Sequence, residues 1–170
     1  MKRWILIAIL LITVTSVALS VTQEEYPTVT IPAPKKTVSV SPPPNPKEIL
    51  KLVNVERANA GVKQLDTNSQ LNATATAKAK EMVTEDYYDH ANPKTGKRGI
   101  DMIFAVLGAR CYKASENLSA TDTSQESVQG WMESPPHRLA MLDPKYEIVG
   151  AGVAKTEQYY YAVLHLCDTN

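Results

Sequence analysis

The stretch that decides the fold class is EIVGAGVAKTEQYYYAVLHLC, residues 147–167. Its two halves, EIVGAGVA and QYYYAVLHLC, are rich in β-branched and aromatic residues, and the short polar run KTE separates them. This pattern predicts a β-hairpin with a short loop. Tyr159 and Tyr161 are expected on one face of the second strand and Tyr160 on the other, because side chains alternate along a strand.

The sequence before this hairpin has helical patterns instead. Asn45, Pro46 and Glu48 form a capping signal, and the helix that they begin is expected to stop at Gly61. The later helical patterns are SQLNATATAKAKEMVTEDYY, RGIDMIFAVLGA, a segment from the capping residue Ser124 to Trp131, and the short turn HRLAML. Helices first and strands last predict one α+β layered domain over residues 46–170.

The N-terminal residues differ in composition from this domain. Lys2 and Arg3 precede an uncharged stretch that ends in small residues, so residues 1–20 have the layout of a secretory signal peptide. An uncleaved membrane anchor over residues 4–21 is the alternative, because that stretch is about long enough to span a thin bilayer. Either interpretation predicts export of the remainder. Residues 21–45 are rich in Pro, Thr and Val without an apolar period, which is typical of an extended linker.

The charge of the chain argues against a nucleic-acid partner. The sequence has 18 Lys and Arg and 18 Asp and Glu, so its formal net charge is zero. Removal of a signal peptide would take away Lys2 and Arg3 and no acid, leaving a slightly acidic exported part. Such a domain has no electrostatic reason to bind nucleic acid. A membrane contact is expected only through the N-terminal segment.

Cys111 and Cys167 are the two cysteines of the chain. An even number of cysteines in an exported protein favours a disulfide between them. The alternative is a metal site in which both thiols act together with His165, although the spacing of His165 and Cys167 is a weak zinc pattern.

The stretch WMESPPHRLAML, residues 131–142, places His137 directly after Pro135 and Pro136. The prolines would end one helix and begin the next, so His137 is expected near the free N–H groups of a helix start. The positive field there disfavours imidazolium, and a neutral imidazole suits metal binding or general-base chemistry. The alternative is a structural hydrogen bond from His137 to Glu116. For His90, the structural alternative is capping of free carbonyls at a helix end.

Six segments, in this order, resemble the CAP superfamily of cysteine-rich secretory proteins, antigen five and pathogenesis-related proteins, and most closely its bacterial SCP-domain branch. They are LVNVERANAGVKQL, LNATATAKAKEM, YYDH with His90, SENLSA with Glu116 and Asn117, WMESPPHRLAML with His137, and VGAGVAKTEQYYYAVLHL. The resemblance covers the chain from about Pro46 to Cys167. It implies a three-layer α-β-α sandwich with a surface cleft.

In this family, two histidines and two glutamates line the cleft in many members, and some members bind a divalent metal there, commonly zinc. His90, Glu116 and His137 match three of these positions, so the resemblance implies that they are metal ligands. The fourth position is Ser134 in this sequence. The neighbouring Glu133 is displaced by one residue, which rotates it by about 100° on a helix.

The resemblance implies an extracellular binding module for a lipid, glycan, peptide or protein, because related proteins mostly act by binding. Its cleft would contain His90, Glu116, His137, Asn117 and Glu133. The alternative is an extracellular metal-dependent hydrolase that uses His90 and His137 as ligands. Glu116 would then be a third ligand or the candidate catalytic group that activates a metal-bound water. The missing fourth acid counts against catalysis more than against metal binding.

Overall fold

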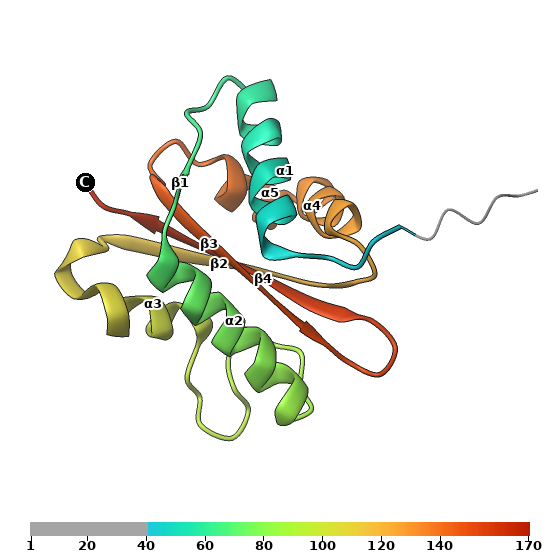
Figure 1. The fold of residues 1–170 in the computed structure, drawn as a ribbon. Coiled ribbons are helices and arrows are strands. Elements are labelled where there is room, and N and C mark those ends of the chain that lie inside the picture. The colour runs from blue at the N-terminus through green and yellow to red at the C-terminus, as the bar shows by residue number, and fades with distance from the viewer. Residues whose placement is uncertain (1–40) are drawn as a thin grey trace, which may run out of the picture. The chain divides into compact units, whose positions relative to one another are not determined.

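The computed structural model describes residues 41–170 (Figure 1). The predicted signal peptide or anchor, and all but the end of the predicted linker, lie outside the described residues. Within residues 41–170, no helix is both long enough and apolar enough to cross a membrane.

The described residues form five α-helices, one short 3-10 helix and four strands. In chain order the elements are α1 (Pro46–Asn59), β1 (Asp66–Thr67), α2 (Ser69–Thr84), α3 (Gly99–Leu107), the 3-10 helix Gly108–Arg110, β2 (Lys113–Thr121), α4 (Ser124–Glu133), α5 (Pro135–Leu142), β3 (Ile148–Lys155) and β4 (Tyr160–Asp168). The predicted hairpin is present as β3 and β4. The sequence did not predict β2, because its residues, KASENLSAT, are mostly polar and do not alternate in the way that a half-buried strand does.

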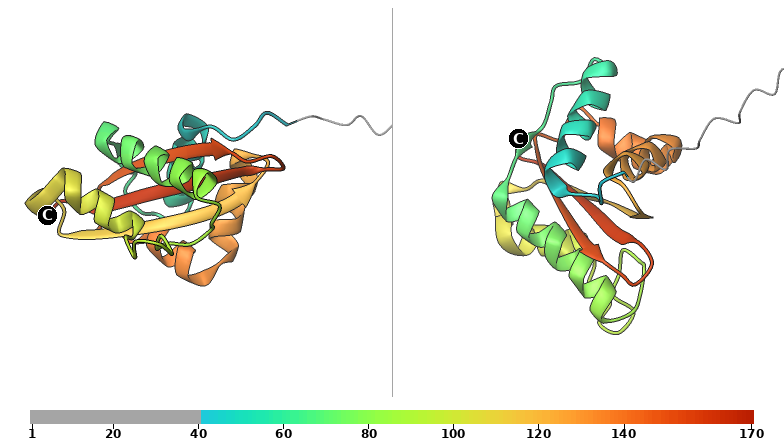
Figure 2. Two further views of the ribbon diagram at one scale, coloured as in Figure 1. Left: turned by 90° about the horizontal axis from the view of Figure 1, so that it is seen from below. Right: turned by 45° about the vertical axis from the view of Figure 1, so that its right-hand side comes forward.

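The four strands form one mixed sheet in the order β1-β3-β4-β2. β1 pairs in parallel with β3, whereas β4 is antiparallel to both β3 and β2. α2 and α3 cover one face of the sheet, and α1, α4 and α5 cover the other (Figures 1 and 2). This architecture confirms the predicted α+β class and the α-β-α sandwich with antiparallel C-terminal strands.

Local capping determines where the helices begin. The side chain of Asn45 accepts a hydrogen bond from the amide of Glu48 at 2.9 Å, as the capping signal predicts. The prediction that Ser124 caps α4 is wrong by one residue. The cap is Thr123, because its hydroxyl accepts a hydrogen bond from the amide of Glu126 at 3.1 Å.

α2 ends at Thr84, before the predicted end at Tyr88. Asp86 has a left-handed backbone conformation, with φ of 53°. The amide of Tyr87 then donates to the carbonyl of Met82 at 3.0 Å. This is the Schellman arrangement, which closes the last turn of a helix. The chain therefore leaves α2 as a loop, residues 85–98, and this loop contains His90.

The two faces of the sheet are packed differently. The face under α1, α4 and α5 holds the largest apolar core, which includes the fully or almost fully buried Ile49, Val53, Trp131, Leu164 and Leu166. On the other face, α2 lies very close to β3. A Cβ atom on Gly150 or Gly152 would overlap the backbone of α2, so glycine at both positions permits this approach.

Candidate functional site

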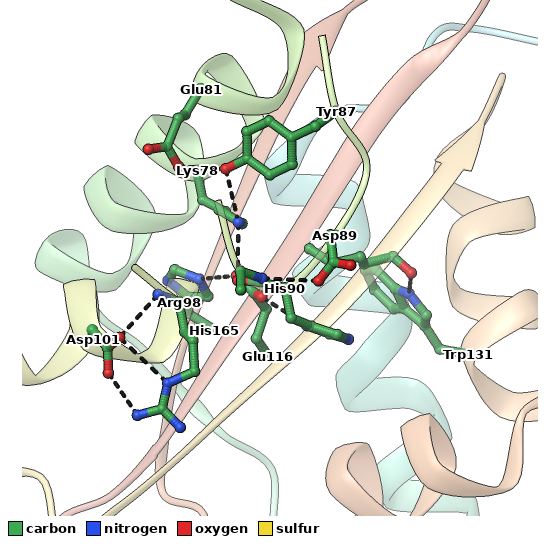
Figure 3. A network of polar contacts seen from close by, with 12 residues as sticks. Lys78, Glu81, Tyr87, Asp89, His90, Arg98, Asp101, Glu116, Trp131 and His165 are labelled. Atoms are coloured by element: carbon green, nitrogen blue, oxygen red, sulfur yellow. Dashed lines mark hydrogen bonds and ion pairs between the residues drawn. The ribbon is translucent and has the colours of Figure 1, made fainter. Parts of the chain in front are cut away.

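The centre of the site is the carboxylate of Glu116 on β2. Glu116 lies directly opposite His165 in the register of β2 and β4, and Nε2 of His165 is 2.9 Å from Oε2 of Glu116. The second oxygen, Oε1, is 2.8 Å from Nδ1 of His90 (Figure 3). The side chain of Glu116 is only 2% exposed. Two histidines therefore occupy both oxygens of one buried carboxylate.

A glycine on α3 makes room for this carboxylate. Gly99 begins α3, and a Cβ atom at this position would overlap the carboxylate of Glu116. The amide of Gly99 also donates to the carbonyl of His90 at 3.0 Å. Gly99 thus holds the His90 loop beside Glu116 and leaves space for the side chain.

Lys78 supports the site from α2 (Figure 3). Its ammonium donates to the carbonyl of His90 and to the hydroxyl of Tyr87, each at 3.0 Å. Lys78 is fully buried, and burial lowers its pKa, although the negative field of Glu116 opposes that shift. The ammonium therefore fixes the backbone of His90 and places a cation near the buried carboxylate.

His137 approaches the site from the other side of the edge strand β2. It lies in the first turn of α5, and its ring centroid is 6.4 Å from that of His90. The side-chain amide of Asn117 donates to the carbonyl of His137 at 3.0 Å and so ties α5 to β2. The alternative role for His137, a hydrogen bond to Glu116, is not the one seen, because His90 and His165 take both oxygens.

The hydrogen bonds set the protonation of the site. Burial opposes ionisation of Glu116, but the hydrogen bonds from His165 and His90 outweigh it and hold the pKa of Glu116 below its usual value. An ionised carboxylate only accepts hydrogen bonds, so Nδ1 of His90 carries the proton that faces it. In neutral His90, the lone pair of Nε2 is then available.

The pKa values of the two neighbouring histidines move in opposite directions. The hydrogen bond to Glu116 raises the pKa of His90, and burial opposes this only in part. Burial, together with the charge of His90, lowers the pKa of His137. Near neutral pH, His90 is therefore the better proton donor of the pair and His137 the better acceptor.

Glu133, which the sequence placed in the cleft, does not join this cluster. It is exposed at the end of α4, and its Oε1 accepts a hydrogen bond from Nε2 of Gln129 at 2.8 Å. One residue of displacement on a helix turns a side chain by about 100°, and this accounts for its direction.

Comparison with known proteins decides the family. The model of the cysteine-rich secretory protein family, CAP, matches residues 50–168. The chain belongs to the CAP family. This confirms the resemblance on which the site residues were chosen.

The chain spans less than half the length of the curated relatives that it matches. The uncharacterized protein YkwD of Bacillus subtilis is 32% identical over 111 residues, which is 65% of this chain and 42% of YkwD. An extracellular protein containing a SCP domain from Bacillus anthracis has a TM-score of 0.61 at 22% identity, covering 72% of this chain and 39% of its own. An outer surface protein of Borrelia burgdorferi has a TM-score of 0.66 at 17% identity, covering 73% of this chain and 92% of its own. The two solved structures share the fold of this CAP domain.

The CAP domain does not assemble the three predicted metal ligands as one group. Among residues 41–170, no three His, Cys, Asp or Glu side chains are placed to hold a metal ion. Glu116 is the reason, because its oxygens are already bound to His90 and His165. Glu116 holds Nδ1 of His90 in the way that carboxylates orient metal-bound histidines.

Cys111 and Cys167 form a disulfide in the CAP domain, which is the pairing that the sequence favoured. The alternative metal site with both thiols and His165 is not formed. Both ring nitrogens of His165 have other partners, Glu116 at 2.9 Å and the hydroxyl of Thr74 at 2.9 Å.

Sequence reasoning missed the roles of His165 and Lys78. The sequence suggested a role for His165 in the alternative metal site with both thiols, and its pairing with Glu116 became visible only once β2 was known to be a strand. Lys78 has a signal in the sequence that was not used: it lies on the apolar stripe of α2, between Ala75 and Met82. A lysine on a buried helix face needs a partner.

Proposed function

We propose that this chain is an exported CAP-family binding module whose ligand contacts the exposed parts of His90 and His137. One observation carries this proposal: the buried carboxylate at the centre of the site, Glu116, has both oxygens bound to histidines. A general base must reach the proton that it removes, and Glu116 is 2% exposed. The side chain of His90, by contrast, is 52% exposed. The side chains of the site that a ligand can reach are therefore the imidazoles of His90 and His137. Two imidazoles without an accessible carboxylate suit ligand binding.

Export is part of the same proposal. Residues 1–20 have the layout of a signal peptide, with an anchor over residues 4–21 as the alternative. Two proteins with the same fold are described as an extracellular protein and an outer surface protein. We expect the ligand to be a lipid, glycan, peptide or protein outside the cytoplasm.

A divalent metal, most readily zinc, is a proposed component of the site. His90 and His137 would hold it, and Glu116 would fix the tautomer of His90 through Nδ1. When bound at an open site, such an ion acts as a Lewis acid and lowers the pKa of water. Two protein ligands predict weaker binding than the three or four of most zinc sites.

One observation favours a metal-dependent hydrolase as the second candidate. The pKa values of His90 and His137 are pushed apart, upward for His90 and downward for His137. The lowered pKa keeps His137 neutral, which is the form in which an imidazole binds a metal, and Glu116 holds Nδ1 of His90, which leaves Nε2 as the second ligand atom. Glu116 would act in this case as a positioning residue for His90.

Zinc binding and ligand retention by the full-length chain test these proposals together. The variants are His90→Ala/His137→Ala and, as a matched control away from the site, the exposed Asp66→Asn. Zinc is measured by calorimetry, and ligand retention on vesicles of defined lipids and on purified cell-wall glycans. Retention that the double variant loses and the control keeps would support the binding module. Zinc binding together with hydrolysis of a screened substrate, both lost in the double variant, would favour the second candidate. If a folded double variant matches the parent in every assay, both candidates are wrong and the histidines are structural.

A further inference from the structure

A second concave site lies at the other end of the face covered by α2. It is a pocket of about 430 Å³ between the end of α2 and the turn that joins β3 to β4, two segments that lie at the same end of the sheet in Figure 1. Met82 and Val83 contribute its apolar wall. No residue of the His90–Glu116–His137 site lines it. Its volume is in the range of small-ligand sites.

The charges in this pocket have one sign. Asp86 and Glu157 line it, and none of its lining residues is Lys, Arg or His. Within the described residues, neither carboxylate takes part in a salt bridge. The pocket therefore carries negative charge, which a positively charged ligand would match.

Tyrosine rings supply the second feature of the pocket. Tyr159 and Tyr161 line it, with their centroids 5.6 Å apart in an edge-to-face arrangement. Tyr161 is also stacked on Tyr88 at 5.2 Å. Burial, a hydrogen bond with Tyr159 and the charge of Asp86 raise the pKa of Tyr161 to about 12, so its ring is neutral at physiological pH. Neutral aromatic faces attract cations through their quadrupole.

The turn that carries Glu157 is held by a local hydrogen-bond network. The hydroxyl of Thr156 accepts from the amides of Gln158 and Tyr159 at 3.2 and 2.9 Å. The same hydroxyl donates to the carbonyl of Tyr159 at 2.8 Å. The carboxylate and the ring therefore project from a fixed backbone, which lowers the entropy cost of binding.

The backbone conformation of Asp86 fixes where its carboxylate begins. Asp86 takes the left-handed position after α2, with φ of 53°, where glycine is the usual residue. Glycine adopts this conformation without the steric cost that a Cβ atom brings. An aspartate here loses that advantage and places a carboxylate in the pocket.

We infer that the pocket bounded by Asp86, Glu157, Tyr159 and Tyr161 binds an organic cation, an ammonium or guanidinium group. The two carboxylates supply charge, and the partly exposed Tyr159 supplies the ring that a cation can reach. Tyr161 is 8% exposed and stacked on Tyr88, so it supports Tyr159 from behind. Because both acids are exposed, the expected dissociation constant is on the order of 1 mM. The pocket shares no lining residue with the proposed cleft, so this inference does not depend on the proposed function.

Paired probes that differ only in charge test the inference. The full-length chain, labelled with ¹⁵N, is titrated with choline and, separately, with its neutral isostere 3,3-dimethylbutan-1-ol. A second pair is N-acetylarginine amide and N-acetylcitrulline amide, which distinguishes guanidinium from ammonium. The amides of Asp86 and of residues 156–161 are expected to shift with at least one cation and not with its neutral partner. Equal shifts for both members of each pair, or shifts elsewhere only, would overturn the inference.

Variants then assign the binding to the pocket. Glu157→Gln and Asp86→Gly should each weaken binding about three- to fivefold, because each removes one exposed charge near the ligand. Asp86→Gly should do so without loss of thermal stability, since glycine suits that conformation. Asp66→Asn and the His90→Ala/His137→Ala variant should bind as the parent does. Unchanged affinity in both pocket variants would contradict the assignment.

Discussion

The two faces of the sheet are packed with different kinds of residue. Under α1, α4 and α5, thirteen buried residues form one apolar core. Under α2 and α3, two smaller clusters of six and five buried residues flank the Glu116 network, because His165 interrupts the inward side chains of β4 between Val163 and Cys167. The face under α1, α4 and α5 is packed with apolar residues, whereas the face under α2 and α3 has less apolar packing and holds the buried charge of Glu116.

Each face has one buried cation, and the two cations have different partners. Arg57 donates to backbone carbonyls, among them those of Lys63 at 2.8 Å and Met141 at 2.8 Å. It joins α1 to the loops that follow α1 and α5. Lys78 donates to the carbonyl of His90 and lies in the field of Glu116. The same kind of group therefore serves the fold on one face and the site on the other.

The largest expected effect is on the apolar face. Trp131 is 1% exposed, and its Nε1 donates to the carbonyl of Leu118 at 2.9 Å. Trp131→Ala should lower the free energy of unfolding by about 3–5 kcal/mol, from lost burial and the cavity left behind. Denaturant titration measures this. Trp131→Phe retains most of the volume and should cost less than Trp131→Ala. A loss below about 1 kcal/mol for the alanine variant would show that this core is not where the stability resides.

An intermediate loss of stability is expected when either buried cation is replaced, and the pKa of His90 should distinguish the two replacements. Arg57→Met and Lys78→Met should each cost about 1–3 kcal/mol, because each removes a charged donor from buried polar groups. Arg57 donates to the carbonyls of Lys63 and Met141. Lys78 donates to the hydroxyl of Tyr87 and to the carbonyl of His90, which would keep only the amide of Gly99. Only Lys78→Met should also raise the pKa of His90, since the charge of Lys78 lowers that pKa. Histidine NMR titration reads out this difference. If both variants shift His90 equally, or neither does, Lys78 does not have the specific role assigned to it.

The smallest expected effect is on the pH dependence of the free energy of unfolding. It should be measured in the presence of a chelator, so that no metal ion binds the histidines. The folded pKa of His90 is raised, so its pairing with Glu116 stabilises the fold below the unfolded pKa of about 6.5 and loses that contribution as pH rises through the folded value. The advantage of the parent over His90→Ala should be largest near about pH 5–6, and below about 1 kcal/mol because His90 is half exposed.

His137→Ala is the control of opposite sign for this prediction. The folded pKa of His137 is lowered, so protonation in the unfolded chain destabilises the parent as pH falls below about 6.5. The variant should gain stability relative to the parent over that range. Unfolding curves at several pH values check both slopes, and parallel pH profiles for the two variants would contradict the assignment of the shifts.

Much of the fold was accessible from the sequence because its signals are local. The cap at Asn45, the glycine after α3 and the two β-branched runs each specify an element by nearby chemistry. β2 could not be predicted from the sequence, because its residues are mostly polar and their hydrogen-bonding partners lie on elements far away in the chain. Glu116 is matched by His165, and Asn117 by α5. His90 and His137 were identified by resemblance to the family. The distance between them, and the two hydrogen bonds that occupy both oxygens of Glu116, depend on the register of the strands, which patterns in a single sequence do not encode.

The position of β4 has a consequence for how the molecule is made. β4 is the last strand in the chain, yet it lies between β3 and β2 in the sheet. Neither neighbour has its full set of hydrogen-bonding partners until residues 160–168 have been synthesised. Glu116 can therefore pair with His165 only after residues 160–168 are present, so the buried network of the site can form only once the last described strand has joined the sheet.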